Sequence, residues 1–362
     1  MRLLILASAD AIHARRWVSW FRERGHEVMF ATLEPSEGKV VQDEHPLPSY
    51  SSLKGLKYPM AAFSLSRLVK IFNPQLVNAH YLPGYGFLAS LVPKARPLVI
   101  STWGSDVLIN ATRSPLHRLR ARFALRAAEL VTCDAAVVGD TLNKLGVDSP
   151  RILETPMGID PELFYPPEKK EPCRGEDGRE RPLRIISTRR HEPLYDVESL
   201  LRATVILRES GRKFEIEVAG DGTERGRLES FAERHHLKEL VHFTGLLSSG
   251  QLAEALRKAD IYISTSRSDS TSVSLLEAMA SGVFPVVTDI KGNTQWIEHG
   301  RNGLTFPPGD FGSLSERLAR AFENESLRLE AVEKNLETVR SKALWEDNMK
   351  VVEEAFRKKA GE

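Results

Sequence analysis

Ile261-Tyr-Ile-Ser-Thr-Ser-Arg-Ser-Asp-Ser-Thr-Ser-Val-Ser-Leu-Leu-Glu-Ala-Met-Ala-Ser-Gly282 is the stretch that decides the fold. An apolar run ends in a Ser/Thr-rich turn, and the turn opens into an apolar stretch of helical period. This order predicts a buried strand, a loop and a helix. Amides of the loop and of the helix N-terminus would converge on one point and favour a phosphate there. The segment therefore predicts an anion site at the end of a strand.

Two acids flank this predicted anion site. Glu277 follows Asp269 by eight positions, which places Asp269 in the loop and Glu277 about two turns into the helix. A carboxylate can accept hydrogen bonds from both vicinal hydroxyls of a ribose, so the pair suits a nucleotide. In a second reading, Asp269 only caps the helix and Glu277 is a solvated helix residue. The spacing alone leaves both readings open.

The same strand-then-helix pattern extends along the chain. Short Val/Ile/Leu-rich runs bounded by Gly, Pro, Asp or Ser alternate with longer stretches of helical period, which is typical of βα units on a parallel sheet. The predicted strands are 2–7, 27–32, 76–80, 98–102, 130–134 and 151–155, then 183–188, 214–219, 241–245, 261–266, 284–288 and 303–306. The predicted helices are 13–24, 61–72, 114–128 and 136–145, then 196–210, 223–236, 249–258, 271–281 and 310–323, with helical period again over 336–359.

Two domains follow from the length and from the restart of this pattern. A chain of 362 residues exceeds the size at which one core usually keeps growing. Residues 166–182 are rich in Pro, Gly and charge and cannot fold alone, so we interpret them as a linker between domains 1–165 and 183–340. Open α/β sheets bind ligands at the carboxyl ends of their strands. We therefore expect two doubly wound, Rossmann-like domains that face each other across a cleft, with the active site between them.

The composition indicates a soluble, globular protein, because 41% of the residues are hydrophobic and 27% are charged. The apolar run at 1–7 is too short for the core of a signal peptide. No run reaches the roughly 18 apolar residues that a membrane-spanning helix requires. Cys133 and Cys173 give neither a disulfide framework nor a metal quartet, so we expect a cytoplasmic location.

One segment is strongly basic although the net charge is only +1. Five arginines and one histidine occur there without an acidic residue between them: Arg113, His117, Arg118, Arg120, Arg122 and Arg126. Such a helix face could lie on an anionic membrane surface, which would place the protein at the inner face of the membrane. It could equally be a solvated basic face. We expect no nucleic-acid partner.

The residues around Asp269 and Glu277 resemble the E-x7-E motif of retaining GT-B glycosyltransferases, in particular glycosyltransferase family 4 (glycosyl transferases group 1). Further matches are Gly220-Asp-Gly222, Val241-His-Phe-Thr-Gly245, Ala259-Asp260, Leu276-Glu-Ala-Met-Ala280, Gly282-Val-Phe-Pro-Val-Val287 and Asn302-Gly-Leu304. The matches cover 183–308 almost continuously. The resemblance implies the GT-B fold, in which the last helix, assigned here to 341–362, crosses back onto the first domain.

The resemblance also implies roles for residues of the second domain. Glu277 would hold the donor ribose, amides around Ser272 and Val273 would hold the diphosphate, and Asp269 would contact the transferred sugar. The residues implied in donor binding are Arg189, Arg190, Gly220, Ser270, Thr271, Ser272, Val273 and Glu277. Those implied in catalysis are Asp269, Glu277, Arg190 and His80.

The second domain departs from the family pattern at two positions. Asp269 stands where the family usually has Glu, which shortens the reach by one methylene. The family places an Arg and then a Lys after the first strand of this domain; Arg190 matches the arginine, but Tyr195 occupies the lysine position. Arg189 is the candidate to supply the missing charge, since the departing diphosphate needs positive charge nearby. The alternative is that Arg189 and Arg190 form a surface pair.

The first domain matches the family less closely. Family members often carry a His where this chain has Trp103, which can pack against a sugar and donate one hydrogen bond but cannot act as acid or base. His80 is the candidate to compensate, or else a structural residue at a strand end. His13 is a candidate contact to donor or acceptor, or simply starts a helix. Asp106 would orient the loop or meet the acceptor.

Together these residues predict a retaining, metal-independent glycosyltransferase of the hexosyltransferase type. It would move a sugar from a nucleotide-diphosphate sugar, used as a co-substrate and with no cofactor, to a hydroxyl acceptor in a glycolipid or an envelope polysaccharide. Two alternatives share the architecture. One is a nucleotide-sugar 2-epimerase, and the other is an inactive protein that binds nucleotide sugars, which the changes at Trp103, Tyr195 and Asp269 would permit.

Overall fold

The computed structural model describes residues 1–34, 44–47, 57–169 and 181–362. Its residues form two compact units, Met1–Pro156 with Asp347–Glu362, and Met157–Glu346. The predicted boundary at 165 differs from the unit boundary after Pro156. The reason is that Ile159 and Phe164 are buried in the core of the second unit. Residues 170–180 of the predicted linker, including Cys173, lie outside the described residues.

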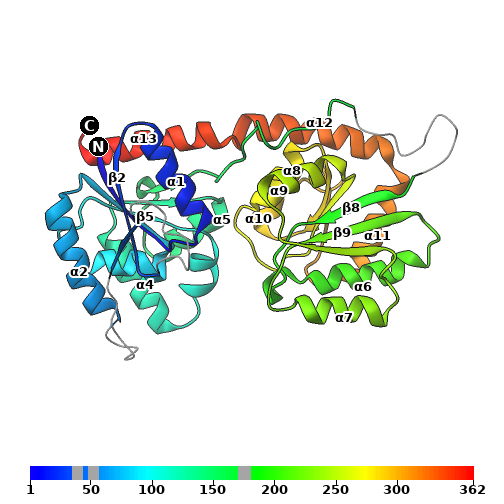
Figure 1. Ribbon diagram of the computed structural model, residues 1–362, viewed down its shortest axis with the longest axis horizontal. Helices are drawn as coiled ribbons and strands as arrows, with labels where there is room; N and C mark the ends of the chain where they lie inside the picture. The colour runs from blue at the N-terminus through cyan, green and yellow to red at the C-terminus, as the bar shows by residue number, and fades with distance from the viewer. Residues whose placement is uncertain (35–43, 48–56, 170–180) are drawn as a thin grey trace. The chain divides into compact units, whose positions relative to one another are not determined.

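The first unit is built on a parallel sheet whose strand order is β3-β2-β1-β4-β5-β6-β7 (Figure 1). Its strands are β1 Arg2–Leu6, β2 Glu27–Thr32, β3 Glu44–Pro46, β4 Leu76–His80, β5 Leu98–Ser101, β6 Leu130–Cys133 and β7 Ile152–Glu154. The central strands β4, β5 and β6 are buried along their whole length. This burial on both faces agrees with the Val/Ile/Leu residues that open each of them and with the lack of an apolar/polar alternation.

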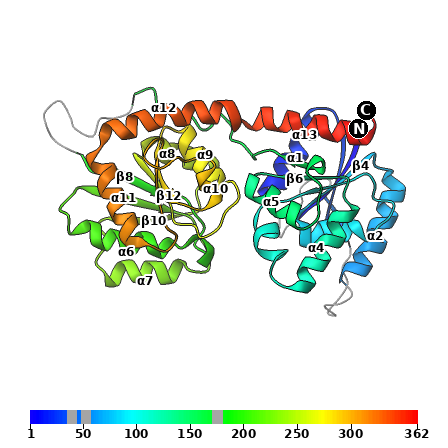
Figure 2. The same ribbon diagram turned by 180° about the vertical axis from the view of Figure 1, so that it is seen from behind.

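Helices cover both faces of this sheet, with α1 and α13 on one side and α2 and α4 on the other (Figures 1 and 2). The helices are α1 Ile12–Glu23, α2 Lys57–Phe72, α3 Phe87–Ser90, α4 Pro115–Ala127, α5 Ala136–Lys144 and α13 Trp345–Ala360. Two π-helical segments, η1 Tyr81–Gly86 and η2 Asp106–Asn110, follow β4 and β5. The C-terminal helix packs on α1, where Phe356 stacks on Phe21 with ring centroids 5.5 Å apart.

The second unit has a parallel sheet of order β10-β9-β8-β11-β12-β13. Its strands are β8 Leu183–Ser187, β9 Phe214–Ala219, β10 Val241–Gly245, β11 Ile261–Ser264, β12 Phe284–Thr288 and β13 Leu304–Phe306. Its helices are α6 Val197–Arg208, α7 Arg225–Arg234, α8 Ser249–Lys258, α9 Val273–Ala280, α10 Lys291–Thr294, α11 Phe311–Glu323 and α12 Glu325–Lys342. Helices α6, α7 and α11 lie on one face of the sheet, and α8, α9 and α12 on the other (Figure 1).

The predicted fold class is confirmed: both units are doubly wound α/β folds with parallel sheets. The C-terminal helix assigned to 341–362 corresponds to α13, and the helical period over 336–359 also includes the end of α12. The chain leaves the helical path after α12, where the Ile159 amide donates to the Ala343 carbonyl (2.8 Å) and the Trp345 amide donates to the Ile159 carbonyl (2.9 Å). These bridge bonds replace helical ones and separate α12 from α13. No helix in the described part of the chain is long and apolar enough to cross a bilayer.

Candidate functional site

Each sheet has one point where the strand order reverses, between β1 and β4 in the first unit and between β8 and β11 in the second. Loops that leave the carboxyl ends of these neighbouring strands diverge there, and this is where open α/β sheets bind ligands. In the second unit the loops after β8 and β11 carry Arg189 and Asp269. In the first unit β1 leads to His13 and β4 ends at His80. The fold therefore places predicted site residues at the switch point of each sheet.

Arg189 is the centre of the site in the second unit. It is buried, and one guanidinium nitrogen, Nη1, donates to the hydroxyls of Ser272 (2.8 Å) and Ser274 (2.7 Å). The other, Nη2, donates to the Asp269 carboxylate at 2.5 Å. The guanidinium also lies 4.4 Å from the centroid of the Tyr195 ring. A single arginine thus joins the loop after β8 to the start of α9.

This arginine is a permanent cation. Burial works against its charge, but the Asp269 carboxylate together with the nearby Tyr262 and Tyr195 outweighs burial and raises the pKa of Arg189 above its ordinary value. Its Nε is buried without a hydrogen-bond partner among the described residues. A buried polar group without a partner is costly, so the guanidinium retains capacity to bind a further acceptor. Positive charge and an unused donor therefore coincide at the helix start.

Ser272, and not Asp269, is the N-cap of α9, and its hydroxyl accepts from the Leu275 amide at 3.4 Å. The reading in which Asp269 only caps the helix is therefore wrong. The Asp269 carboxylate instead accepts hydrogen bonds from the Ser270 amide (3.0 Å) and from Arg189. The positive end of the α9 dipole adds to the charge of Arg189 at this point.

Glu277 lies on the partly exposed face of α9. Val273, Ser274 and Glu277 are its only residues that are not buried, and three and four positions along a helix bring side chains onto one face. Glu277 thus shares a face with Ser274, which contacts Arg189. The predicted carboxylate and the predicted phosphate site occupy the same side of the helix.

The loop that precedes α9 is held by α10. The Gln295 side chain donates to the Thr271 hydroxyl (2.9 Å) and to the Ser270 carbonyl (3.2 Å). A Cβ atom on Gly292 would lie only 2.0 Å from that same carbonyl oxygen, so only glycine lets the two backbones approach so closely. The sequence did not predict a role for Gly292 or Gln295, because they follow β12 whereas the loop itself follows β11.

The structure separates the two neighbouring arginines after β8. The Arg190 side chain is 71% exposed and, within the described part of the chain, is paired only with Glu192, at 3.9 Å, whereas Arg189 turns inward. The two do not form a surface pair as the alternative proposed. The loop backbone lies close to Gly220, where a Cβ would be 2.5 Å from the Arg189 carbonyl oxygen, so this position requires glycine. The residue matching the family arginine is therefore not the one that contacts α9.

In the first unit, His80, Trp103, Trp17 and His13 form one cluster of rings. Trp103 Nε1 donates to His80 Nδ1 at 3.3 Å. The Trp17 ring meets His80 edge-on with centroids 4.9 Å apart, and His13 meets Trp103 in the same way at 5.6 Å. Sequence reasoning missed Trp17, although it follows His13 by four positions and so lies on the same face of α1.

His80 is a poor acid or base in this cluster. It is fully buried, and burial together with nearby His13 lowers the pKa of His80 to about 3, so the ring is neutral at physiological pH. Because Nδ1 accepts from Trp103, the neutral ring carries its proton on Nε2. That nitrogen has no partner among the described residues. The geometry makes His80 a hydrogen-bond donor.

Asp106 orients the loops beside this cluster. One carboxylate oxygen accepts from the Leu82 amide (2.9 Å), and the other accepts from the amides of Trp103 (2.9 Å) and Val107 (3.1 Å). The side chain is completely buried, and burial raises the pKa of Asp106 to about 6 although these amides oppose the shift. Of its two predicted roles, the structure shows the positioning one.

We expect Asp106→Asn to remove part of the pH dependence of stability. The Asp106 carboxyl holds its proton more tightly in the folded state than in the unfolded state. Its contribution to the free energy of unfolding should therefore fall by up to about 3 kcal/mol as the pH rises from about 4 to about 6. Urea unfolding over this range checks the change. Equal pH dependence in the wild type and the variant would contradict the assigned environment.

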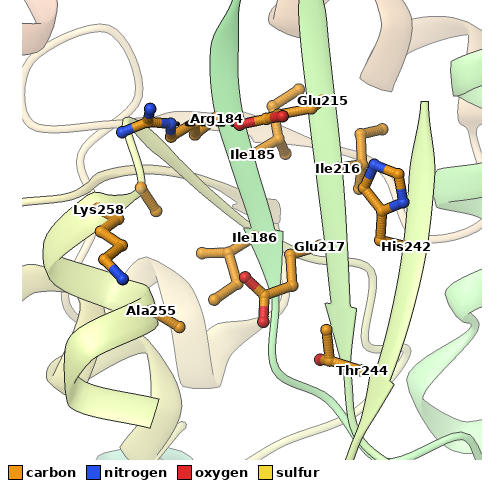
Figure 3. Close-up of a pocket in the computed structure, with 11 residues that line it drawn as sticks. Arg184, Ile185, Ile186, Glu215, Ile216, Glu217, His242, Thr244, Ala255 and Lys258 are labelled. Atoms are coloured by element: carbon orange, nitrogen blue, oxygen red, sulfur yellow. Dashed lines mark hydrogen bonds and ion pairs between the residues drawn. The ribbon is translucent and has the colours of Figure 1, made fainter. Parts of the chain in front are cut away.

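A separate pocket of about 400 Å³ lies on the face of β8, β9 and β10 that is turned toward α8 (Figure 3). Its polar lining includes Arg184, Glu215, Glu217, His242 and Lys258. Arg184 is bound to Glu215 at 3.2 Å, so opposite charges within the lining already compensate each other. None of the predicted site residues lines this pocket. Among the described residues, no group of three or more His, Cys, Asp or Glu is arranged to hold a metal ion.

Both halves of the chain match families of glycosyltransferases. Residues 2–135 match the family described as glycosyl transferase 4-like, and residues 171–338 match glycosyl transferases group 1. The chain is 28% identical to the amylovoran biosynthesis glycosyltransferase AmsK of Erwinia amylovora over 71% of its own length. This alignment spans 66% of AmsK, and another spans only 44% of a putative colanic acid biosynthesis glycosyltransferase of Escherichia coli.

Solved structures show the same fold over nearly the whole chain. Sucrose-phosphate synthase from Thermosynechococcus elongatus has a TM-score of 0.84 at 15% identity, covering 99% of this chain and 98% of that one. HepE of Anabaena in complex with UDP has a TM-score of 0.81 at 17% identity, covering 98% of this chain and 99% of HepE. The chain therefore has the GT-B fold and is related in both halves to glycosyltransferases.

Proposed function

We propose that this protein is a retaining, family 4 glycosyltransferase that moves a hexose from a nucleotide-diphosphate sugar to a hydroxyl acceptor. One observation carries the proposal. Arg189 is a buried cation at the switch point of the second sheet, and it is bonded to Ser272, Ser274 and Asp269 at the start of α9. Such an arrangement would bind an anion next to carboxylates, as a nucleotide-diphosphate sugar requires.

Arg189 and the N-terminus of α9 would bind the diphosphate and stabilise the charge that develops as it departs. Donors fixed in advance stabilise such charge at little reorganisation cost. Arg190, also predicted to bind the diphosphate, would at most contribute from the exposed side of the loop. Glu277, on the same face of α9, would accept the ribose hydroxyls, and Asp269 would meet the transferred sugar.

The bond that breaks joins C1 of the sugar to the diphosphate, which leaves with the electron pair. The acceptor oxygen would attack the same face of C1, and its proton would pass to the departing phosphate. The second unit supplies charge stabilisation and positioning for this step. In the first unit, His80 would act as a hydrogen-bond donor through Nε2 and would not abstract the proton of the acceptor hydroxyl. His13 and Trp103 remain the proposed contacts to sugar or acceptor.

The donor base and the acceptor are proposed from the relatives. The related structures of HepE hold UDP, UDP with glucose, and UDP-glucose, so uridine nucleotides are the first donors to test. AmsK is named for the biosynthesis of amylovoran. We therefore propose a glycolipid or polysaccharide acceptor, with an anionic membrane surface as a partner through Arg113–Arg126. The cytoplasmic location stays a prediction. The 2-epimerase is not favoured, because the relatives named above are not epimerases and His80 is not a base.

The activity is tested with a panel of nucleotide-diphosphate sugars and glycan acceptors, by following the release of nucleoside diphosphate. Nuclear magnetic resonance of the product then gives its anomeric configuration, and a glycoside with the configuration of the donor is expected. A product of opposite configuration would contradict retention. Nucleotide binding without product from any pair would favour the inactive binding protein.

We expect activity to survive treatment with excess EDTA. Arg189 and the α9 dipole supply the positive charge at the proposed diphosphate site, which is the task that a divalent ion performs in metal-dependent transferases. Initial rates with and without EDTA are the measurement. A loss of activity that Mg²⁺ or Mn²⁺ restores would show that the protein uses a metal.

A further inference from the structure

Helix α4 exposes a row of large apolar side chains. Leu116 is 72% exposed, Leu119 is 66% exposed and Phe123 is 49% exposed. Spacings of three and four residues place all three on one face of the helix. Its opposite face, formed by Ala121, Ala124 and Leu125, is buried in the unit. The exposed row is therefore additional to the face that holds α4 in the fold.

A row of arginines runs beside this apolar row. Arg118, Arg122 and Arg126 follow one another at intervals of four, and all three are exposed. No acidic residue occurs between Asp106 and Glu129. Arg120 has a different role, because its guanidinium stacks on the rings of Tyr58 and Phe87 at 4.4 and 3.9 Å. Arg118, Arg122 and Arg126 therefore remain exposed, whereas Arg120 packs against the fold.

Helix α2 extends the same kind of surface. It exposes Phe63 and Ile71 together with Arg67 and Lys70, and it contains no acidic residue. Helices α2 and α4 lie on the same side of the first sheet (Figure 1), and the Arg120 guanidinium of α4 lies over the Tyr58 ring of α2. Both helices therefore expose apolar side chains together with basic ones, and they do so on the same side of the first sheet.

A solvated basic face accounts for the arginines but not for exposed leucine and phenylalanine beside them. An anionic bilayer matches both kinds of side chain, since guanidinium groups pair with lipid phosphates and apolar side chains enter the acyl boundary. We propose that α2 and α4 form a docking surface for an anionic membrane, with Leu116, Leu119 and Phe123 inserted at its surface. This inference rests on the proposed membrane partner and identifies the side chains that bind it.

Vesicle co-sedimentation of the full chain tests the surface. Vesicles of phosphatidylcholine with phosphatidylglycerol should bind the protein at low salt, and vesicles of phosphatidylcholine alone should bind it at least about tenfold more weakly. Leu116→Ser with Leu119→Ser, and separately Arg118→Glu with Arg122→Glu, should each lower binding to the anionic vesicles by about tenfold or more. All four side chains are exposed, so the fold should tolerate these changes.

Matched controls change the same chemistry elsewhere. Leu329→Ser with Val351→Ser alters two exposed apolar residues on α12 and α13, and Lys213→Glu with Lys358→Glu makes the same change in net charge. Both controls should bind as the wild type does. No binding to anionic vesicles, or equal loss in the controls, would overturn the inference. A change of oligomeric state in the α4 variants at unaltered vesicle binding would also overturn it, in favour of a second copy of the chain.

Nucleotide binding by the same preparations keeps this test separate from the proposed activity. The α4 variants should bind nucleoside diphosphates as the wild type does, because Arg189 and α9 belong to the other unit. Vesicle binding without nucleotide binding would leave the membrane surface intact and refute the donor site alone.

Discussion

Replacing Arg189 with alanine is expected to lower kcat by about 10²- to 10³-fold, the range found when one preorganised charge-stabilising donor is removed from an active site. The change removes the buried cation that joins Ser272, Ser274 and Asp269. Initial rates at saturating donor measure it. Arg189→Lys should recover part of the rate, because it keeps the charge but cannot reach all three partners.

Arg190→Ala is the matched control for this prediction. The two arginines are adjacent, but Arg190 is mostly exposed and contacts only Glu192 among the described residues. Its replacement should change kcat by about tenfold or less, which leaves room for a secondary contribution to diphosphate binding. The reverse ranking, with Arg190 essential and Arg189 dispensable, would contradict the site described above.

Arg189→Ala should also destabilise the second unit, because it leaves the Asp269 carboxylate without its arginine partner. Breaking a buried ion pair from one side typically costs about 3–5 kcal/mol, and the partial exposure of Asp269 places the expected loss toward the lower end. Arg189→Ala with Asp269→Ala should regain much of the stability without regaining activity. Urea unfolding of the single and double variants therefore distinguishes a structural loss from a catalytic one.

Glu277→Gln is expected to raise the Kd for the donor by about 10- to 100-fold, since hydrogen bonds to a charged group contribute about 1.5–3 kcal/mol. The substitution keeps the size of the side chain on α9 and removes its charge. Isothermal titration calorimetry measures the change. Glu316→Gln, an exposed acid on α11, is the control and should have no effect. Unchanged affinity in Glu277→Gln would place the ribose elsewhere.

Most of the fold is predictable from the sequence because local patterns decide it. The runs at 27–32, 76–80, 214–219, 241–245 and 284–288 match their strands residue for residue. The short elements β3, α3 and α10 were missed, since three or four residues carry too little periodicity. The helical period over 336–359 does not by itself show the break between α12 and α13, because the break depends on hydrogen bonds to Ile159, far away in the sequence.

The site was predictable in outline but not in its contacts. Strand ends and helix starts placed Asp269, Ser272 and Glu277 at one edge of a sheet, and the structure has them there. The inward turn of Arg189 onto α9 joins two loops that are far apart in the sequence, and the loop backbone at Arg189 also lies against Gly220. No local pattern encodes that approach. The proton position on His80 likewise depends on Trp103, which follows a different strand.

The proposed diphosphate site is tested most directly by calorimetric titration of the wild type, Arg189→Ala and Arg190→Ala with UDP, GDP, ADP and dTDP. We expect the wild type to bind at least one of these diphosphates, Arg189→Ala to bind it at least about tenfold more weakly, and Arg190→Ala to lose less affinity than Arg189→Ala. Equal affinity in the wild type and Arg189→Ala would contradict the central claim that this buried arginine holds the diphosphate of the donor.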